Sequence, residues 1–208
     1  MNFDRKRKPK DPCKRCFLHK DFCLCSSIPS LSLRTKISLI IHKRELKRTS
    51  NTGRLAIEAL TNSEMRTRGE HCSPLELSDL LTNDYQTLLL YPTEDATPLT
   101  KDYVANFSKP IQLIVPDGNW RQASKVNTRH KELANVPRVK VVTINADLAL
   151  MRKETTENGM ATLQAIAYAL GTIEGANVKQ QLLSLYEKKL LRTLQGRGTM
   201  PASGHGIS

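Results

Sequence analysis

The sequence predicts an α/β domain with a largely parallel sheet that helices cover on both faces. Short apolar runs recur along the chain, as is typical of strands buried on both faces. Stretches with helical patterning separate these runs, and such alternation favours parallel strands joined by crossover helices. With 208 residues, 39% of them hydrophobic, the chain is long enough to bury one substantial core.

Four strands are predicted from continuous apolar runs. The first covers residues 36–41 (KISLII) and the second 86–91 (QTLLLY). The third covers 111–115 (IQLIV), and the fourth covers 138–144 (RVKVVTI). Each has the length and the β-branched or leucine-rich composition of a buried strand.

Helices are predicted between and after these strands. Residues 49–53 (TSNTG) supply capping side chains before a helix over about 54–66. A second helix over 120–129 follows the third strand, and a final pair covers about 161–172 and 178–194. The last residues, 196–208, are rich in Gly and Ser and are predicted to be a disordered tail.

Positive charge is concentrated in the first quarter of the chain. Residues 1–25 carry eight Lys/Arg against three acids, and residues 26–54 carry seven against one. The remaining residues hold 17 against 16, so they supply only +1 of the net charge of +12. This asymmetry indicates a polyanionic partner, which is RNA, DNA or an anionic membrane.

Four of the five cysteines lie within 13 residues in a C-x2-C-x6-C-x-C pattern. Such clustering in a reducing compartment favours a metal over disulfides, and four thiolates complete a tetrahedral zinc shell. His19 lies between the two pairs but is not needed as a ligand, and a redox Cys-x-x-Cys would not require the second pair. We therefore expect a structural Zn²⁺ site formed by Cys13, Cys16, Cys23 and Cys25.

The third strand ends in a group of reactive side chains. It leads into Asp117, a glycine, Asn119, the chain's single tryptophan, Trp120, and Arg121. In open α/β sheets ligands bind beyond the carboxyl ends of the strands, so we expect the site here. The dinucleotide motif G-x-G-x-x-G, the P-loop, G-x-S-x-G and H-E-x-x-H are all absent, which leaves those chemistries without motif support.

Four segments in order resemble one family. They are the cysteine pattern, residues 41–55 (IHKRELKRTSNTGRL), residues 117–123 (DGNWRQA) and residues 161–165 (ATLQA). Together they resemble the DTW-domain family of tRNA-uridine aminocarboxypropyltransferases. Two positions depart from the family pattern, because Asn119 replaces a Thr and Gln164 replaces a Glu.

The resemblance implies a SPOUT-like fold with a C-terminal trefoil knot that binds S-adenosylmethionine. It also implies transfer of the 3-amino-3-carboxypropyl group to N3 of a tRNA uridine, in the variable loop, with release of 5'-methylthioadenosine. The implied organisation is a basic N-terminus with a zinc knuckle (1–30), a DTW catalytic domain (31–195) and a tail (196–208).

The residues present suit this chemistry. Uridine N3 must lose a proton before it attacks, so a carboxylate is a sensible general base. We assign that role to Asp117, and we assign base stacking to Trp120 unless its indole is a core residue. The loops expected to hold the donor contribute Leu90, Tyr91, Pro92, Pro116, Asp117, Asn119, Trp120 and Thr162.

A second set of residues is expected to contact RNA. It consists of His42, Arg44, Asn51, Thr52, Arg54 and Arg121. Asn51, Thr52 and Thr162 also fit a role as helix caps, and Arg121 also fits a surface ion pair or the donor's carboxylate.

Two alternatives remain open. They are a SPOUT-type RNA methyltransferase and a non-catalytic zinc-knuckle RNA-binding protein. No run of about 20 apolar residues and no signal peptide is evident, so a cytoplasmic protein with no membrane contact and no obligate protein partner is expected.

Overall fold

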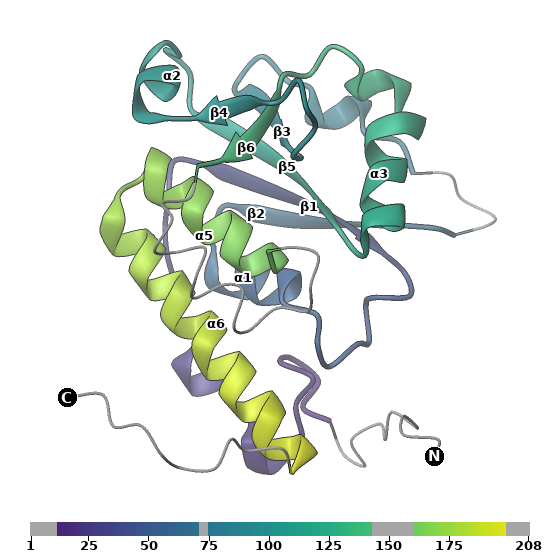
Figure 1. The fold of residues 1–208 in the computed structure, drawn as a ribbon, viewed down its shortest axis with the longest axis vertical. Coiled ribbons are helices and arrows are strands. Elements are labelled where there is room, and N and C mark those ends of the chain that lie inside the picture. The colour runs from purple at the N-terminus through teal and green to yellow at the C-terminus, as the bar shows by residue number, and fades with distance from the viewer. Residues whose placement is uncertain (1–11, 71–74, 143–159, 199–208) are drawn as a thin grey trace.

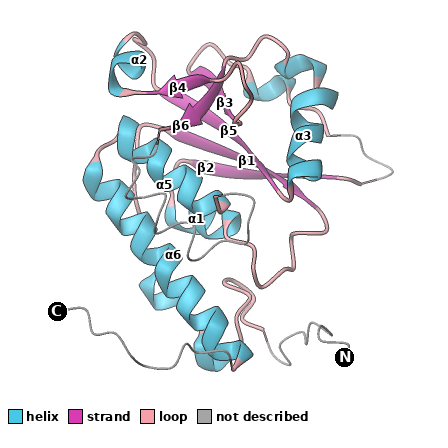
Figure 2. Cartoon of the chain, viewed as in Figure 1, coloured by secondary structure: helices cyan, strands magenta, loops and turns pink. Residues whose placement is uncertain are grey.

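The computed structural model describes residues 12–70, 75–142 and 160–198. Its centre is a six-stranded sheet with the strand order β2-β1-β5-β3-β6-β4, and every described strand pair is parallel. Helices lie on both sides of this sheet (Figures 1 and 2). The predicted α/β class is confirmed.

The described elements follow in chain order. The strands are β1 (Lys36–His42), β2 (Ser63–Arg68), β3 (Gln86–Leu90), β4 (Thr97–Leu99), β5 (Ile111–Asp117) and β6 (Arg138–Val141). The α-helices are α1 (Gly53–Ala59), α2 (Lys101–Ala105), α3 (Trp120–Arg129), α5 (Thr162–Ile173) and α6 (Ala176–Arg197). Short 3-10 turns are η1 (Lys20–Phe22), η2 (Cys25–Ser27), η3 (Ser78–Leu80) and η4 (Lys131–Leu133).

The two strands at the edges of the sheet are the ones that sequence patterns did not predict. The helix expected over 54–66 ends at Ala59, and β2 begins at Ser63. Because β2 pairs only with β1, its sequence SEMRTR needs no continuous apolar run. At the other edge β4 has only three residues, including Pro98, and proline is tolerated in a strand that pairs on one side.

Side-chain alternation along the central strands divides the core into two layers. Leu39, Ile41 and Leu113 face α1, α5 and α6 in the larger cluster. Ile40 and Ile114 face α3, η3 and η4 on the opposite side. Burying one such side chain stabilises the fold by about 1.5–3 kcal/mol. The apolar runs that predicted the strands thus exist because both faces are covered.

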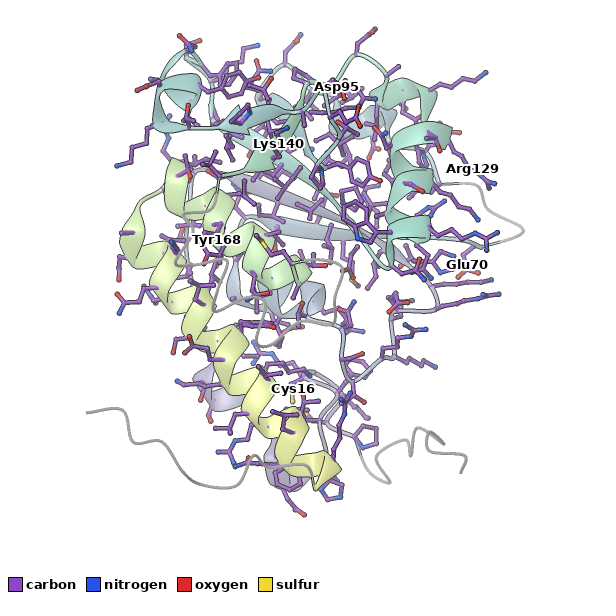
Figure 3. The ribbon with its side chains drawn as sticks, in the orientation of Figure 1. Cys16, Glu70, Asp95, Arg129, Lys140 and Tyr168 are labelled. Atoms are coloured by element: carbon purple, nitrogen blue, oxygen red, sulfur yellow. The ribbon has the colours of Figure 1, made fainter. Side chains whose placement is uncertain are left out.

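The cysteine-rich segment packs against α1 and α6 through three cations. Lys189 of α6 is buried, and its Nζ donates to the Cys16 carbonyl over 2.7 Å. The Arg54 guanidinium lies 4.2 Å from the centre of the Phe17 ring, and Arg15 forms an ion pair with Glu58 of α1. Figure 3 shows Cys16 next to α6. Part of the N-terminal positive charge therefore fastens this segment to the domain.

Burial of Lys189 has an electrostatic consequence. Desolvation lowers the pKa of its ammonium to about 8, and the nearby cysteines oppose this shift. A cluster of thiolates beside Lys189 would favour the charged ammonium, because opposite charges stabilise each other in a partly desolvated setting. Thiolates in the cysteine-rich segment would thus strengthen its contact with α6.

The C-terminal helix extends further than predicted. Helix α6 ends at Arg197, and Gly198 caps it in the left-handed conformation that glycine adopts most easily. Residues 199–208 of the predicted tail lie outside the described part of the chain. Residues 143–159, which connect β6 to α5, are also outside it, and the predicted C-terminal knot stays a prediction. No helix in the described ranges is long and apolar enough to cross a bilayer.

Candidate active site

The site lies at the carboxyl ends of two neighbouring strands, β1 and β5, whose following helices cover opposite faces of the sheet. Strand β1 is followed by α1 on one face of the sheet, and its neighbour β5 is followed by α3 on the other (Figure 1). The carboxyl ends of β1 and β5 coincide, with Ile41 opposite Asp117. Such a switch point leaves a crevice between the two connections, which is the usual ligand position in open α/β sheets.

Asp117 is a buried carboxylate in this position. It is 4% exposed, and each oxygen accepts a hydrogen bond over 2.5 Å, one from the Asn51 amide and one from the Thr162 hydroxyl. Burial raises the pKa of Asp117, while these two hydrogen bonds oppose the shift. A Cβ at Gly53 would lie 3.0 Å from the carboxyl carbon, so glycine leaves room for the acid.

The loop before α1 is fastened to the start of α5. The Thr52 hydroxyl accepts from the Leu163 amide over 3.3 Å, and Asn51 Oδ1 accepts from the Arg54 amide over 3.2 Å. Asn51 therefore caps α1 with one end of its side chain and holds Asp117 with the other. This arrangement combines the capping and site roles that the sequence left open for Asn51.

The turn between β5 and α3 shows why Asn119 can stand where the family has a threonine. Asn119 Oδ1 accepts from the Gln122 amide over 2.9 Å, and Gln122 Oε1 accepts from the Asn119 amide over 2.8 Å. This is a reciprocal capping box, in which asparagine caps at least as well as threonine. Gly118 precedes it at a φ of +144°, and a Cβ there would lie 2.5 Å from Gln122 Oε1.

Gln164 has a comparable role at the start of α5. Its Oε1 accepts from the Ala161 amide over 3.1 Å, and the residue is 5% exposed. A glutamate oxygen would accept the same hydrogen bond, so this contact requires an acceptor rather than a negative charge. The second departure from the family pattern therefore preserves the local structure.

Trp120 lies at the surface of the site. It is 51% exposed, which excludes the interpretation that the indole is a core residue. Its ring meets that of the buried Tyr91 edge-on, with centroids 6.0 Å apart. Since β3 and β5 are neighbours, the loops after them lie side by side. The structure thus brings Leu90, Tyr91 and Pro92 close to the segment from Pro116 to Trp120.

The residues expected to contact RNA fall into two groups. Arg44 and Arg121 are exposed. Arg54 instead donates to the Leu46 carbonyl over 2.9 Å and covers Phe17. Burial, followed by the charge of Arg68, lowers the pKa of His42, which favours the neutral imidazole at pH 7. Arg44 and Arg121 are therefore the two members best placed to meet a phosphate.

Arg68 is a site residue that sequence patterns did not indicate. It ends β2, is 8% exposed, and donates from Nη1 to the Gln122 carbonyl over 2.9 Å. The contact fastens the edge strand to the first turn of α3. Had β2 been predicted, Arg68 would have been expected at the carboxyl end of a strand, as Asp117 is. The sequence of β2 instead reads as the end of the preceding helix.

The four clustered cysteines have the geometry of a metal site. Their sulfur atoms all lie within 4.8 Å of one another, with separations of 3.6 Å for Cys13 and Cys25 and 3.8 Å for Cys16 and Cys23. Tetrahedral zinc with Zn–S bonds of about 2.3 Å places its sulfurs about 3.8 Å apart. A disulfide would require about 2.05 Å. Backbone amides of Cys16 and Arg15 lower the pKa of Cys13 to about 6, whereas burial raises the pKa of Cys25.

The chain is similar to proteins of one name from three animals. The chain is 25% identical over 181 residues to tRNA-uridine aminocarboxypropyltransferase 2 of Drosophila melanogaster, covering 84% of this chain and 71% of that protein. The proteins of the same name from Macaca fascicularis and Mus musculus are 27% and 28% identical over 86% and 85% of the chain. The match spans less than two thirds of these mammalian proteins, at 61% and 60%. No solved structure matches.

The family comparison covers nearly the whole chain. The DTW domain matches residues 10–194, which include the cysteine cluster, all six strands and most of α6. The segments around Asp117 and Thr162 that resemble the family in sequence are the ones that meet in space. The chain belongs to the DTW domain family.

Proposed function

We propose that this protein transfers the 3-amino-3-carboxypropyl group of S-adenosylmethionine to N3 of a uridine in the variable loop of tRNA. The observation that carries the proposal is Asp117, a buried carboxylate of raised pKa at the switch point. An exposed indole lies three residues after it. The names of the relatives, each a tRNA-uridine aminocarboxypropyltransferase, support the same reaction.

Proton removal from N3 is the step that the chain itself must supply. A raised pKa brings Asp117 closer to neutral pH and makes it a better proton acceptor than an ordinary aspartate. Because Asp117 is buried, the half-buried Thr162, whose hydroxyl donates to Asp117 Oδ1, links it to the substrate. Thr162 accepts the N3 proton as it passes its own proton to Asp117 Oδ1.

The transfer itself needs alignment more than further catalytic groups. The N3 lone pair forms a bond to the methylene carbon next to the sulfonium, the carbon–sulfur bond breaks, and 5'-methylthioadenosine leaves with the electron pair. A sulfonium is already a good leaving group, so holding nitrogen, carbon and sulfur in line is the main requirement. The loops after β3 and β5 and the start of α5 form the donor side, with apolar Leu90 and Pro92 suited to adenine.

The zinc knuckle has a structural role in this proposal. Cys13, Cys16, Cys23 and Cys25 would hold the ion, and four thiolates leave no open position for a substrate. The contacts of Arg54 and Lys189 couple the knuckle to α1 and α6. Zinc thus rigidifies the N-terminal segment at the flank of the site.

Removing the base should slow the reaction strongly and preserve binding. In Asp117→Asn the side chain keeps its shape but cannot accept a proton, so kcat should fall by about 10²–10⁴, with tRNA and donor still bound. Thr162→Val should lower kcat because it removes the linking hydroxyl, whereas Thr162→Ser should retain most activity. Mass spectrometry of nucleosides from treated tRNA measures the product.

The pH dependence of stability provides the control for Asp117→Asn. A carboxyl whose folded pKa lies above its unfolded value stabilises the fold when protonated, and this stability is lost as pH rises through the folded pKa. The substituted protein should lack this decline and be no less stable at pH 7. Full turnover by Asp117→Asn, or a methylated uridine as the wild-type product, would contradict the proposal.

Loss of the exposed indole should weaken RNA binding without unfolding the protein. Trp120→Ala should reduce affinity for a uridine-containing oligonucleotide by roughly 5- to 150-fold, because stacking contributes about 1–3 kcal/mol per base. Trp120→Phe keeps an aromatic face and should retain most of the affinity. Equal affinity of the Ala variant and the wild type, measured by fluorescence anisotropy, would remove Trp120 from the RNA site.

Cysteine substitution tests the knuckle. Cys13→Ser and Cys23→Ser should lower the bound zinc below one ion per chain and reduce the melting temperature, since metal binding contributes to folding. Cys72→Ser, which changes the cysteine outside the motif, is the matched control. Zinc is measured by elemental mass spectrometry, and a full zinc content in Cys13→Ser and Cys23→Ser would refute the assignment.

A further inference from the structure

Helix α3 carries three cations along one side. Arg121, Lys125 and Arg129 are four residues apart, which places them on one face at steps of about 6 Å along the axis. The helix contains no Asp or Glu. Like charges four residues apart destabilise a helix, and Arg121 lies in the first turn, where the helix dipole disfavours a cation. Arg129 lies in the last turn, where the dipole favours a cation, but Arg121 and the like-charge spacing are unfavourable for α3 alone and suit an anionic ligand.

Two more arginines lie within electrostatic range of this stripe. Arg44 follows β1, and Arg68 ends β2. Arg129 lowers the pKa of Lys125 most, and burial, Arg121, Arg68 and Arg44 add to the effect. We call these five residues the basic surface: Arg44, Arg68, Arg121, Lys125 and Arg129.

Carboxylates compensate little of this charge. Within the described ranges, Arg44, Arg68, Arg121, Lys125 and Arg129 have no ion pair to a carboxylate, whereas Arg15, Lys36 and Arg48 each have one and Arg66 has two. Glu70 pairs with Lys43 beside the surface, over 3.9 Å. Figure 3 shows Arg129 extending from α3 on the side of the molecule away from α5 and α6.

Arg68 adds evidence for a ligand. Its guanidinium is buried, and burial lowers its pKa. Nη1 donates to Gln122, but Nε has no acceptor in the described part of the chain. A buried charged donor without an acceptor is costly, and a phosphate oxygen is the acceptor that a guanidinium binds best.

We infer that the basic surface binds successive phosphates of the tRNA strand that carries the target uridine. The inference rests on the proposed function for the identity of the RNA. Trp120 precedes Arg121 directly, so a strand held along α3 would present a base to the exposed indole and its sugar-phosphate backbone to the cations. Proteins that hold single-stranded RNA combine a basic track with aromatic stacking in this way.

Paired substitutions test the surface on the full chain. Lys125→Gln with Arg129→Gln removes two charges at sites that glutamine fills without loss of helix propensity. The Kd for an unmodified tRNA transcript should rise about tenfold at physiological salt, and the slope of log K against log salt should become shallower by about 1.4–1.8. The matched control, Lys101→Gln with Lys109→Gln, removes two exposed charges elsewhere and should leave the Kd within about twofold.

Three outcomes would overturn the inference. The first is an unchanged Kd and salt slope in the α3 variant, and the second is an equal loss in the control, which would make net charge the cause. The third is loss of binding to phosphatidylserine vesicles with tRNA binding intact, which would assign the surface to a membrane. Failure of the proposed function is separate, because it appears as wild-type protein that makes no aminocarboxypropylated uridine.

Discussion

The hydrogen bonds to Asp117 hold together the edge of the sheet on which the site depends. Three segments that are far apart in the sequence meet at this carboxylate: the loop before α1, the end of β5 and the start of α5. The absence of a side chain at Gly53 makes the approach possible. A buried charge with only two donors is energetically demanding, which is reflected in the raised pKa of Asp117. The buried position that lets Asp117 join these three segments is thus also what raises its pKa.

The centre of the fold follows from sequence patterns, whereas its edges do not. Strands buried on both faces need continuous apolar runs, so β1, β3 and β5 were predictable, and the helix predicted over 120–129 is α3. Strand β2 pairs on one side only and carries a polar sequence, which resembles the end of a helix. The four-cysteine cluster was predictable because its ligands are local in sequence.

The site was predictable in its parts but not in its connections. A carboxylate and an indole after an apolar run indicate a ligand position, and the structure places both at the switch point. The bonds from Asn51 and Thr162 span 66 and 45 residues, and no local pattern encodes such pairs. The exposure of Trp120 likewise depends on how Tyr91 and α3 pack. The structure also shows that the cations have different roles. Arg15 and Arg54 fasten the knuckle to the domain. Helix α3 carries three cations, although the residues after 54 have a net charge of only +1.

The proposed reaction depends most on Asp117 being a carboxyl of raised pKa within the folded protein. Carbon-13 NMR of the aspartate carboxyl groups, titrated with pH and assigned by comparison with Asp117→Asn, measures this directly. We expect a titration midpoint for Asp117 clearly above the ordinary aspartate pKa of about 3.9. A midpoint at or below that value would show that the hydrogen bonds outweigh burial, and it would contradict the role of Asp117 as the general base that deprotonates N3 through Thr162.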